Sequence, residues 1–306
     1  MPVQIEKNIL LIDFPNLAIR NLMASGQKTK FDLWRHMTLK SIIGLIQKFQ
    51  PVEIIICLDG KYVWRKDVYP QYKANRKKLR KKSDIYWSGY YEVYEDTICE
   101  YKTMLPFKIF IDDKMEADDI IAMFCLIFKG QQAHPISRKI TKRPERVIVI
   151  SSDKDFHQLM LYGIDIYDAM TKRMRRWYDY PVEKLRKDLF VKICTADGPR
   201  PGVRGDGIAN LFRGCGKKKA LQLYKEFGPT AIPTEYLTAY KRNEMLMDLK
   251  WYWQASNRKL FWKYINYKVL YNSNEFQQYL KYYNLNQILK KIKIYNNLFR
   301  RLISGG

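Results

Sequence analysis

The sequence predicts an α/β fold with a mainly parallel central sheet, because short apolar runs alternate with segments of helix length. The runs are too short for helices and rich in β-branched residues; they lie at residues 8–12, 52–58, 107–111 and 147–150. Continuous apolar runs are typical of strands buried on both faces, as in parallel sheets. The helix-length segments are residues 32–49, 86–105 and 117–129. This alternation indicates a sheet with flanking helices.

The chain is long and strongly basic. Its 306 residues, 47% of them apolar, suffice for one large domain or one domain with a smaller appendage. Its 55 Lys and Arg against 31 Asp and Glu give a net charge of +24, which favours a polyanionic partner, nucleic acid first. A basic membrane-surface protein or a structural chromatin-like binder would share that charge, so charge alone does not separate these classes.

Cysteine and hydropathy patterns indicate a reducing compartment. The five cysteines are scattered without a CxxC pair, which argues against a disulfide framework or a zinc ribbon. The start of the chain shows no signal-peptide pattern, and no run of about eighteen apolar residues predicts a spanning helix. The three histidines are too few and scattered for a zinc site or a histidine-based triad. We expect a cytoplasmic protein, in the host cytoplasm if the source is viral.

Acidic residues end each predicted strand or open the helix that follows it. They are Asp13, Asp59, Glu116, Asp118, Asp119, Asp153 and Asp155. Because ligands of parallel sheets bind at the carboxyl ends of the strands, we expect these side chains to converge on one cleft. Hard oxygen ligands without Cys or His nearby favour Mg²⁺ or Mn²⁺. Two such ions, about 3.5–4 Å apart, are the usual apparatus for in-line displacement at phosphorus.

Each acid taken singly has a structural interpretation as well. Asp113 or Asp119 can cap a helix, and Asp153 can cap the turn after its strand. The set as a whole has no such structural interpretation. Gathering that many carboxylates costs electrostatic repulsion energy unless cations neutralise their charge.

A basic segment follows Asp59. Residues 61–82 carry ten Lys or Arg and one acid. Aromatic side chains that can stack on bases interleave with these charges; they are Tyr62, Trp64, Tyr69 and Tyr72. A helix here would place Lys73 and Arg76 on one face. These features weigh against a disordered basic loop that gives only non-specific attraction.

Together the motifs resemble the 5′ nuclease superfamily: phage-type 5′→3′ exonucleases, flap endonucleases and the nuclease domain of bacterial DNA polymerase I. The T-even phage ribonuclease H branch looks most similar. The motifs are LIDF, CLDG, WRKDVYPQYKANR, MEADD and ISSDKDFHQL, and they span most of residues 8–228. The resemblance implies a PIN-like nuclease core, with the basic segment as a helical arch over the active site. It also implies metal-dependent cleavage of DNA and RNA–DNA duplexes at a 5′ end or flap, and removal of RNA primers during replication.

The resemblance assigns roles to individual residues. The first metal cluster is implied at Asp13, Asp59, Glu116 and Asp118 or Asp119, and the second begins with Asp153 and Asp155. Lys73 and Arg76 match residues that polarise the scissile phosphate, and with Asp13 and Asp155 they form the expected catalytic set. The nucleic-acid contacts expected from the arch are Tyr72, Lys73, Arg76, Lys77 and Arg80.

The second cluster departs from the family pattern, in which a GDxxDN motif carries two aspartates three residues apart. The matching segment here is GVRGDG, where Asp206 takes the second acidic position and Val203 the first. Either the second metal site has one ligand fewer, or the upstream Asp197 supplies it.

The next segment, GCGKKKALQLYKEFG, resembles the family's helix–hairpin–helix-like element. Gly214 and Gly216 would let backbone amides approach a phosphate, ahead of a positive helix N-terminus at Lys217. Lys218 and Lys219 add charge, and a simple tight turn is the alternative. The implied role is to grip the duplex backbone without reading its sequence, commonly with a bound K⁺.

The sequence thus predicts three regions: a nuclease core at 1–190 with the arch at 61–85, the aspartate motif and hairpin element at 191–228, and a helical region at 229–306. We expect the last region to pack against the core, and we take it as the candidate contact for a single-strand-binding protein or a sliding clamp. We expect the chain to be a monomer.

Two other functions fit part of the sequence. A PIN-type ribonuclease would share the sheet and the acids, but it would need neither the Tyr-Lys-x-x-Arg arch nor the Gly-x-Gly hairpin. The hypothesis of a non-catalytic protein that binds branched DNA is supported by Val203 alone.

Overall fold

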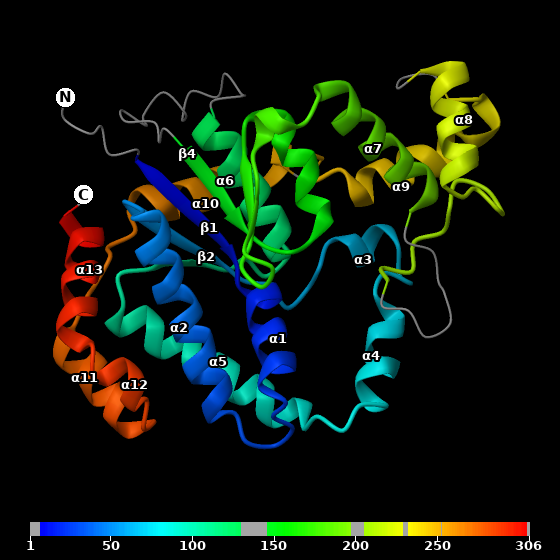
Figure 1. Ribbon diagram of the computed structural model, residues 1–306. Helices are drawn as coiled ribbons and strands as arrows, with labels where there is room; N and C mark the ends of the chain where they lie inside the picture. The colour runs from blue at the N-terminus through cyan, green and yellow to red at the C-terminus, as the bar shows by residue number, and fades with distance from the viewer. Residues whose placement is uncertain (1–6, 130–145, 197–204, 229–231, 252, 305–306) are drawn as a thin grey trace, which may run out of the picture.

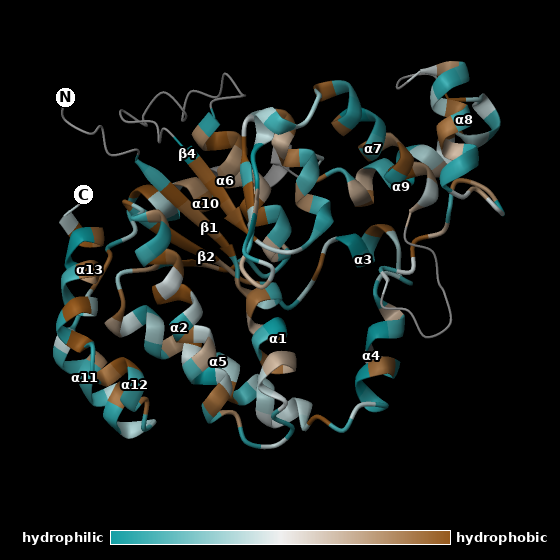
Figure 2. Cartoon of the chain, in the orientation of Figure 1, coloured by the Kyte–Doolittle hydropathy of each residue, from teal (hydrophilic) through white to brown (hydrophobic). Residues whose placement is uncertain are grey.

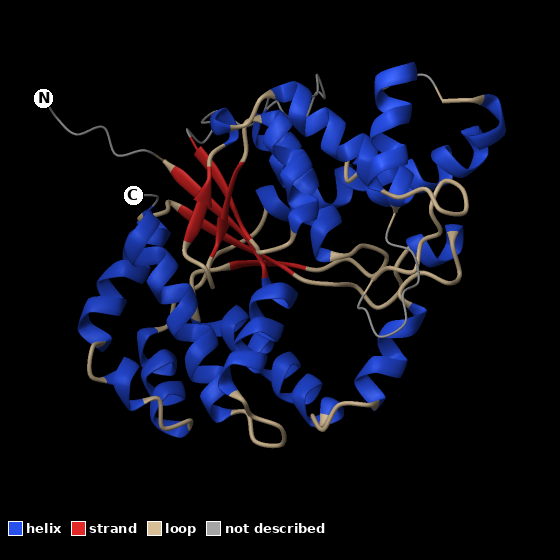
Figure 3. Cartoon of the chain, turned by 45° about the vertical axis from the view of Figure 1, so that its right-hand side comes forward, coloured by secondary structure: helices blue, strands red, loops and turns tan. Residues whose placement is uncertain are grey.

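A single six-stranded sheet forms the centre of the computed structural model (Figure 3). The structure describes residues 7–129, 146–196, 205–228, 232–251 and 253–304. The side chains of Lys77 and of residues 253–258 are not described. Asp197 and Val203 lie outside these ranges. Helices cover both faces of the sheet (Figure 1, Figure 3). The strand order is β3-β2-β1-β4-β5-β6, with β1 to β5 parallel and β6 antiparallel to β5. The predicted α/β class is confirmed.

The strands are β1 (Asn8–Asp13), β2 (Glu53–Cys57), β3 (Lys108–Phe110), β4 (Arg146–Ile150), β5 (Asp165–Asp168) and β6 (Arg173–Arg175). The first four lie where the apolar runs predicted them. The sequence analysis missed β5 and β6, because the polar sequences DIYD and RMR show no apolar run. Their backbones are ordered by pairing, β5 with β4 and β6 with β5.

The α-helices are α1 (Phe14–Ser25), α2 (Asp32–Phe49), α3 (Arg65–Val68), α4 (Ala74–Lys81), α5 (Trp87–Met104), α6 (Ala117–Lys129), α7 (Val182–Thr195), α8 (Lys217–Phe227), α9 (Leu237–Met247), α10 (Trp253–Ile265), α11 (Ser273–Tyr282), α12 (Asn286–Leu289) and α13 (Ile292–Ser304). The 3₁₀ helices within the described ranges are η2 (Lys154–Tyr162), η3 (Trp177–Asp179) and η4 (Thr234–Tyr236). Helices α2, α5 and α6 match their predictions to within one residue at each end. Helix α1 was missed, since it begins directly after β1 without a loop.

The strands bury opposite side chains in two separate layers, as their alternation requires. Leu10 and Ile12 of β1 point into a layer that contains α1, α2 and α5, whereas Ile9 and Leu11 point into a layer with α6 and η2. Figure 2 shows the resulting apolar strands at the centre and hydrophilic surfaces on the outer helices. A third apolar cluster joins α7, α8 and α9, and it includes Tyr72 from the basic segment.

The C-terminal helices pack against the core, as predicted, and they divide among all three clusters. Helix α9 contacts α7, α10 contacts α6, and α11 and α13 contact α5 and α2. In Figure 1, α11 to α13 lie beside α2 and α5, far from α8. Helix α7 crosses the predicted boundary at residue 190 and contributes Phe190 and Ile193 to the third cluster. The three-region division stays a prediction. Within the described ranges, no helix is long and apolar enough to cross a membrane.

Phe299→Ala in α13 tests whether the C-terminal helices belong to the main core. Phe299 is fully buried, and its ring lies 5.9 Å from Phe107 and 5.4 Å from Phe276. Because a buried cavity would remain, we expect the free energy of unfolding to fall by about 3–5 kcal/mol in a single transition, measured by chemical denaturation. Ile294→Ala, at an exposed position of the same helix, is the control and should change it by less than about 1 kcal/mol. A separate early transition for the C-terminal helices would contradict this prediction.

Candidate active site

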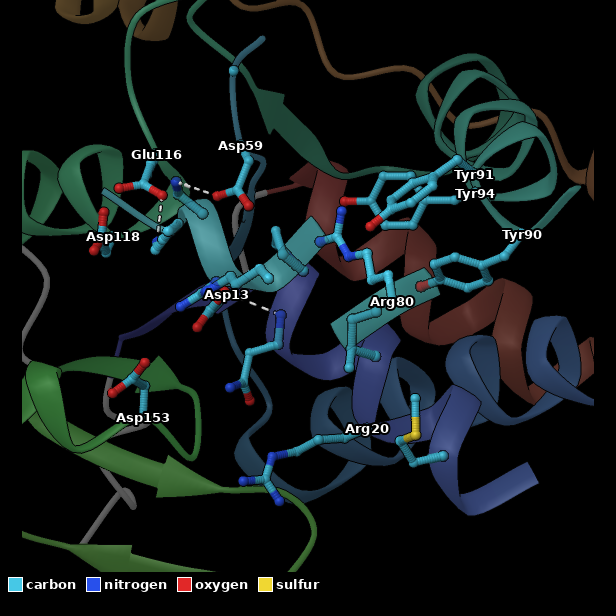
Figure 4. Close-up of a pocket in the computed structure, with 18 of the residues that line it drawn as sticks. Asp13, Arg20, Asp59, Arg80, Tyr90, Tyr91, Tyr94, Glu116, Asp118 and Asp153 are labelled. Atoms are coloured by element: carbon cyan, nitrogen blue, oxygen red, sulfur yellow. Dashed lines mark hydrogen bonds and ion pairs between the residues drawn. The ribbon is translucent and has the colours of Figure 1, made fainter. Parts of the chain in front are cut away.

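A pocket of about 980 Å³ opens at the carboxyl ends of β1, β2 and β4. The chain passes from β1 to β2 and β3 on one side and later places β4 on the other side, so the pocket lies where the strand order reverses, the usual ligand crevice of such sheets. The structure brings six of the predicted acids to its wall; all of them except Asp155 are labelled in Figure 4. They are Asp13, Asp59, Glu116, Asp118, Asp153 and Asp155.

Asp13 is held at the base of the pocket between β1 and β4. Its carboxylate accepts hydrogen bonds from Ser151 Oγ at 2.8 Å and from the backbone N–H of Asn16 at 3.3 Å, so it also caps α1. Burial raises the pKa of Asp13 to about 7, and the charge of Asp59 adds to the rise, while the Ser151 hydrogen bond opposes it. A bound cation would therefore stabilise the ionised form of Asp13.

Asp59 links the end of β2 to the start of α6. Its Oδ1 accepts a hydrogen bond from the backbone N–H of Ala117 at 2.9 Å, seen as a dashed line in Figure 4. The next residue, Gly60, donates its N–H to Met115 O at 2.7 Å, and a Cβ there would overlap the carbonyl oxygen of Asp112. The glycine of the CLDG motif is thus required by this close approach of two backbones.

Glu116 is buried at the start of α6 and is surrounded by donors from the basic segment. Its carboxylate accepts hydrogen bonds from Arg65 Nη1 at 2.9 Å, Tyr72 Oη at 2.8 Å and Lys73 Nζ at 2.5 Å. Burial raises the pKa of Glu116, but the charges of Lys73 and Arg65 outweigh it and lower the pKa to about 2. This carboxylate stays ionised and anchors the basic segment to α6.

Asp118 and Asp119, which the sequence offered as alternatives, have different environments. Asp119 does not line the pocket: it accepts a bidentate pair of hydrogen bonds from Arg65, at 2.8 Å each, and further bonds from Trp64 Nε1 and the Glu116 N–H. Asp118 lines the pocket, and its buried Oδ1 accepts no hydrogen bond from the described residues. Arg65 and Trp64 thus use the oxygens of Asp119 in this structure, and the expected role of Asp119 as a metal ligand stays a prediction.

The acids of the second cluster are each engaged by the protein itself. Asp153 caps η2, as its structural interpretation proposed, through the N–H of Asp155 at 2.9 Å, and it also lines the pocket. Asp155 forms an ion pair with Lys192 of α7; burial raises its pKa, but the charge of Lys192 outweighs this and lowers it. Asp206 lies 2.8 Å from Arg76 Nη2.

The basic segment is partly helical and closes over one side of the pocket. Helix α4 begins at Ala74, so Lys73 precedes it with a left-handed φ of 56° and is not on one helical face with Arg76, as had been expected. Both side chains still line the pocket, as does Arg80. Tyr72 was expected to contact nucleic acid, but it is 2% exposed and its hydroxyl is bound to Glu116, so in this structure it is not available for stacking.

Aromatic side chains of α5 form the opposite wall. Figure 4 shows Tyr90, Tyr91 and Tyr94 across the pocket from the carboxylates, with Arg80 beside them. The guanidinium of Arg80 lies 5.3 Å from the ring centre of Tyr91. The sequence analysis did not single out these tyrosines, since an aromatic residue in an amphipathic helix reads equally well as core.

The donors around the pocket fit a divalent metal ion in kind. The acids of the lining offer carboxylate oxygens; among the described residues no cation pairs with Asp13, and Asp118 Oδ1 accepts no hydrogen bond, although Arg65 Nη1 lies 3.6 Å from it. In the described part of the chain, no three acidic, His or Cys side chains lie close enough together to hold an ion as they stand. Cations of the protein lie beside several of the acids, and the two metal clusters expected from the sequence stay a prediction.

The glycine-rich element before α8 forms a tight turn, which the sequence analysis named as the alternative to a phosphate-binding hairpin. Gly214 has a φ of 82°, which favours glycine, and its carbonyl accepts the N–H of Gly216 at 2.9 Å. Gly216 precedes α8 without a side-chain cap, and Lys217 and Lys218 are exposed at the helix start. Lys219 lies 5.7 Å from the ring centre of Phe212. Whether a phosphate or K⁺ binds here stays a prediction.

Arg65, Ser151, Gln158 and Lys192 are site residues that the sequence analysis missed. Ser151, Gln158 and Arg65 stand inside the quoted motifs, so their position was visible. Their contacts were not, because a buried arginine that binds carboxylates cannot be told from an exposed one in a run of basic residues.

Comparison with known proteins identifies the family. Residues 8–187, more than half of the chain, match the family model of the N-terminal resolvase-like domain of 5′–3′ exonucleases. This chain belongs to the 5′–3′ exonuclease family. The resemblance seen in the sequence is thereby confirmed, and the matched range contains every pocket acid and the whole basic segment.

Relatives within the 5′–3′ exonuclease family include ribonuclease H of Enterobacteria phage T4, 29% identical over 201 residues, which are 63% of this chain and 61% of that protein. The match thus spans less than two thirds of the phage protein. Flap endonuclease Xni of Psychromonas ingrahamii is 25% identical over 233 residues, 72% of this chain and 77% of that enzyme. The fold is shared with a bacteriophage T5 flap endonuclease solved with DNA and metal ions, with a TM-score of 0.59 and 20% identity over 94% of this chain and 98% of that one.

The different roles of Asp118 and Asp119 can be tested by stability. Asp119→Asn should lower the free energy of unfolding by about 3 kcal/mol, since it breaks a buried ion pair with Arg65. Asp118→Asn should leave it unchanged or raise it, because burial raises the pKa of Asp118 well above its usual range, so ionisation of this carboxyl opposes folding and the neutral amide avoids that cost. Denaturant unfolding in EDTA at pH 7 measures both. The reverse order of the two variants would refute the assignment.

Proposed function

We propose that the protein is a divalent-metal-dependent 5′ nuclease that hydrolyses phosphodiesters in DNA and RNA–DNA duplexes with a 5′ end or flap. Removal of RNA primers during replication is the proposed biological role. The proposal is supported by family membership and by the names of the relatives, a ribonuclease H and a flap endonuclease.

One observation carries the proposal: seven carboxylates from five chain segments line the same pocket as four cations of the basic segment, which are Lys61, Lys73, Arg76 and Arg80. The carboxylates suit a divalent cation, and Lys73 and Arg76 suit a phosphate, so both halves of a metal–phosphodiester complex have donors within one cavity. A protein that only binds nucleic acid would need the cations but not the buried carboxylates, which cost desolvation energy.

We propose that Asp13, Asp59 and Asp118 hold the first metal ion, and that Asp153 and Asp155 contribute to the second. Glu116 acts through the cations bound to it. Mg²⁺ is the proposed ion, with Mn²⁺ as a substitute. When bound, such ions activate water and stabilise the leaving oxygen at phosphorus.

Lys73 and Arg76 are the proposed phosphate-binding groups. Lys73 is bound to Glu116 and Arg76 to Asp206, so both side chains are held at the pocket. Once metal ions bind the carboxylates, a phosphate can replace these carboxylates as the partner of Lys73 and Arg76. The planar guanidinium of Arg76 can bind two phosphate oxygens, and the Lys73 ammonium adds a point charge. Both lower the cost of placing a polyanion beside carboxylates.

The pocket is larger than one phosphodiester group needs, and its second wall presents the half-buried Tyr91 and Tyr94 with Arg80, whereas Tyr90 is buried. Aromatic and guanidinium surfaces stack on bases without sequence preference. We propose that this wall accommodates the nucleotides next to the scissile phosphate. Lys217 to Lys219 are the proposed duplex contact. A single-strand-binding protein or sliding clamp as partner, and a monomeric state, stay predictions of the sequence.

The metal dependence and the roles of Asp13 and Lys73 are tested with a 5′-labelled flap substrate and an RNA–DNA hybrid. We expect cleavage with Mg²⁺ or Mn²⁺ and none in EDTA, and loss of cleavage in Asp13→Ala and Asp155→Ala. Lys73→Ala should lower kcat by about 10²–10³-fold, the usual effect of removing one donor to a transition-state charge. Lys40→Ala, an exposed lysine of α2 outside the pocket, should cleave like the unaltered protein.

Metal-independent cutting, or undiminished cutting by both aspartate variants, would exclude this function. The open question of the second metal site is addressed by Asp197→Ala. If Asp197 is the replacement ligand, this variant loses rate at limiting Mg²⁺ and recovers at high Mg²⁺. A full rate at limiting Mg²⁺ would leave the site with one ligand fewer.

A further inference from the structure

We propose that Arg65 and Gln158 are positioning residues of the nuclease site and that both act through one backbone segment of the C-terminal region, residues 246–249. This inference deepens the proposed function and rests on it. The segment ends α9 and begins the turn toward α10. None of its four residues lines the described pocket. Its contribution would therefore be to hold the elements that carry the acids.

Arg65 joins this segment to the start of α6. Its side chain is almost fully buried, and its guanidinium binds Asp119 through both Nη atoms and Glu116 through Nη1. The remaining edge, Nε, donates a hydrogen bond to Leu246 O at 3.0 Å. Nη1 also lies 3.6 Å from Asp118 Oδ1. The planar guanidinium thus sets the distance between the first turn of α6 and the end of α9.

The acceptor at the end of α9 is suited to a cation. The last carbonyls of a helix have no partner within the helix and carry its negative partial charge. Arg65 Nε satisfies the Leu246 carbonyl, which is one of them. The arginine is therefore held from two sides, by carboxylates and by a helix end, which fixes its orientation more firmly than an ion pair alone.

Gln158 joins the same segment to η2, the element that carries Asp155. Its Nε2 donates to Met247 O at 3.2 Å and to Asp155 O at 2.9 Å, and its Oε1 accepts the N–H of Leu249 at 2.9 Å. The side chain is buried, and both ends of its amide are used. Gln158 is thus a spacer between the backbone of Asp155 and the exit from α9.

The two contacts together place both carboxylate-bearing elements against one short piece of chain. Ligands must be held within about 0.5 Å of a productive geometry, and loss of an outer partner typically costs about 10–100-fold in metal affinity. Because Glu116 and Asp118 lie at the start of α6 and Asp155 lies in η2, the spacing of these carboxylates depends on how the two elements are held. Loosening either contact should weaken metal binding.

Two variants separate position from charge. Arg65→Met removes the guanidinium and its hydrogen bonds, but it also removes a positive charge. The loss of that charge by itself would strengthen the binding of a cation. Gln158→Leu removes the amide at similar volume and changes no charge, so weaker binding there can come only from position. Arg65→Lys keeps the charge but lacks the planar guanidinium, and it replaces Arg65→Met in the experiment if Arg65→Met does not fold.

Matched controls lie far from the pocket. Arg35→Met removes a buried arginine of α2 that pairs with Glu100 at 2.6 Å. Asn8→Leu removes a buried amide that donates to Phe49 O at 2.8 Å at the opposite end of β1. Each costs a buried polar contact without touching the site. Thermal unfolding of all variants shows which of them are folded.

The measurement is Mn²⁺ binding to the full chain without nucleic acid, by isothermal titration calorimetry, followed by the Mg²⁺ dependence of flap cleavage. We expect Gln158→Leu and Arg65→Met to weaken Mn²⁺ affinity about 10–100-fold and to shift half-maximal cleavage to higher Mg²⁺, while both controls stay within about 3-fold of the unaltered protein. Unaltered or tighter Mn²⁺ binding by folded Gln158→Leu, or equal weakening by the controls, would overturn the inference. Absence of Mn²⁺ binding and cleavage in the unaltered protein would instead overturn the proposed function.

Discussion

Carboxylates gathered at one end of a parallel sheet repel one another, and the cations that offset this repulsion shape the rest of the structure. Burial, with the charges of Asp59 and Asp153, raises the pKa of Asp13 to about 7 despite the opposing Ser151 hydrogen bond, so several such groups would not stay ionised together without neighbouring positive charge. Arg65, Lys73 and Lys192 supply it to Glu116, Asp119 and Asp155. The acids at the site of a protein with net charge +24 are thus partly neutralised by its own cations, whereas Asp13 has the carboxylates Asp59 and Asp153 as its charged neighbours.

The same ion pairs decide where the basic segment lies. Glu116 takes three donors from this segment, and the N–H of Lys73 binds Asp206 O at 2.8 Å, so the start of α4 is fixed to two separate parts of the site. The cations expected to meet the substrate are therefore positioned by acids of the site before any substrate binds. When a phosphate binds, these cations exchange carboxylate partners for phosphate oxygens. This exchange costs less free energy than ordering a free loop.

How far sequence reasoning reached depends on the kind of signal. The strands at the centre, and the helices α2, α5 and α6, were predicted because their apolar patterns are continuous and local. β5 and β6 were not, since their pairing with β4 and with each other is a long-range contact that DIYD and RMR do not encode by pattern. The acids Asp13, Asp59 and Asp153 were found at strand ends because parallel strands share a polarity, which brings their carboxyl ends to one edge.

By itself, the sequence determined the fold class, the family and the set of acids that could reach one pocket, because periodicity, residue type and order along the chain carry that information. Only the tertiary structure decided what each side chain touches. It turned Asp119 toward Arg65 and Asp118 toward the pocket, and it buried Tyr72 against Glu116. Neighbouring residues of a helix point in directions 100° apart, so adjacent, chemically equal acids acquire different roles once the helix is packed.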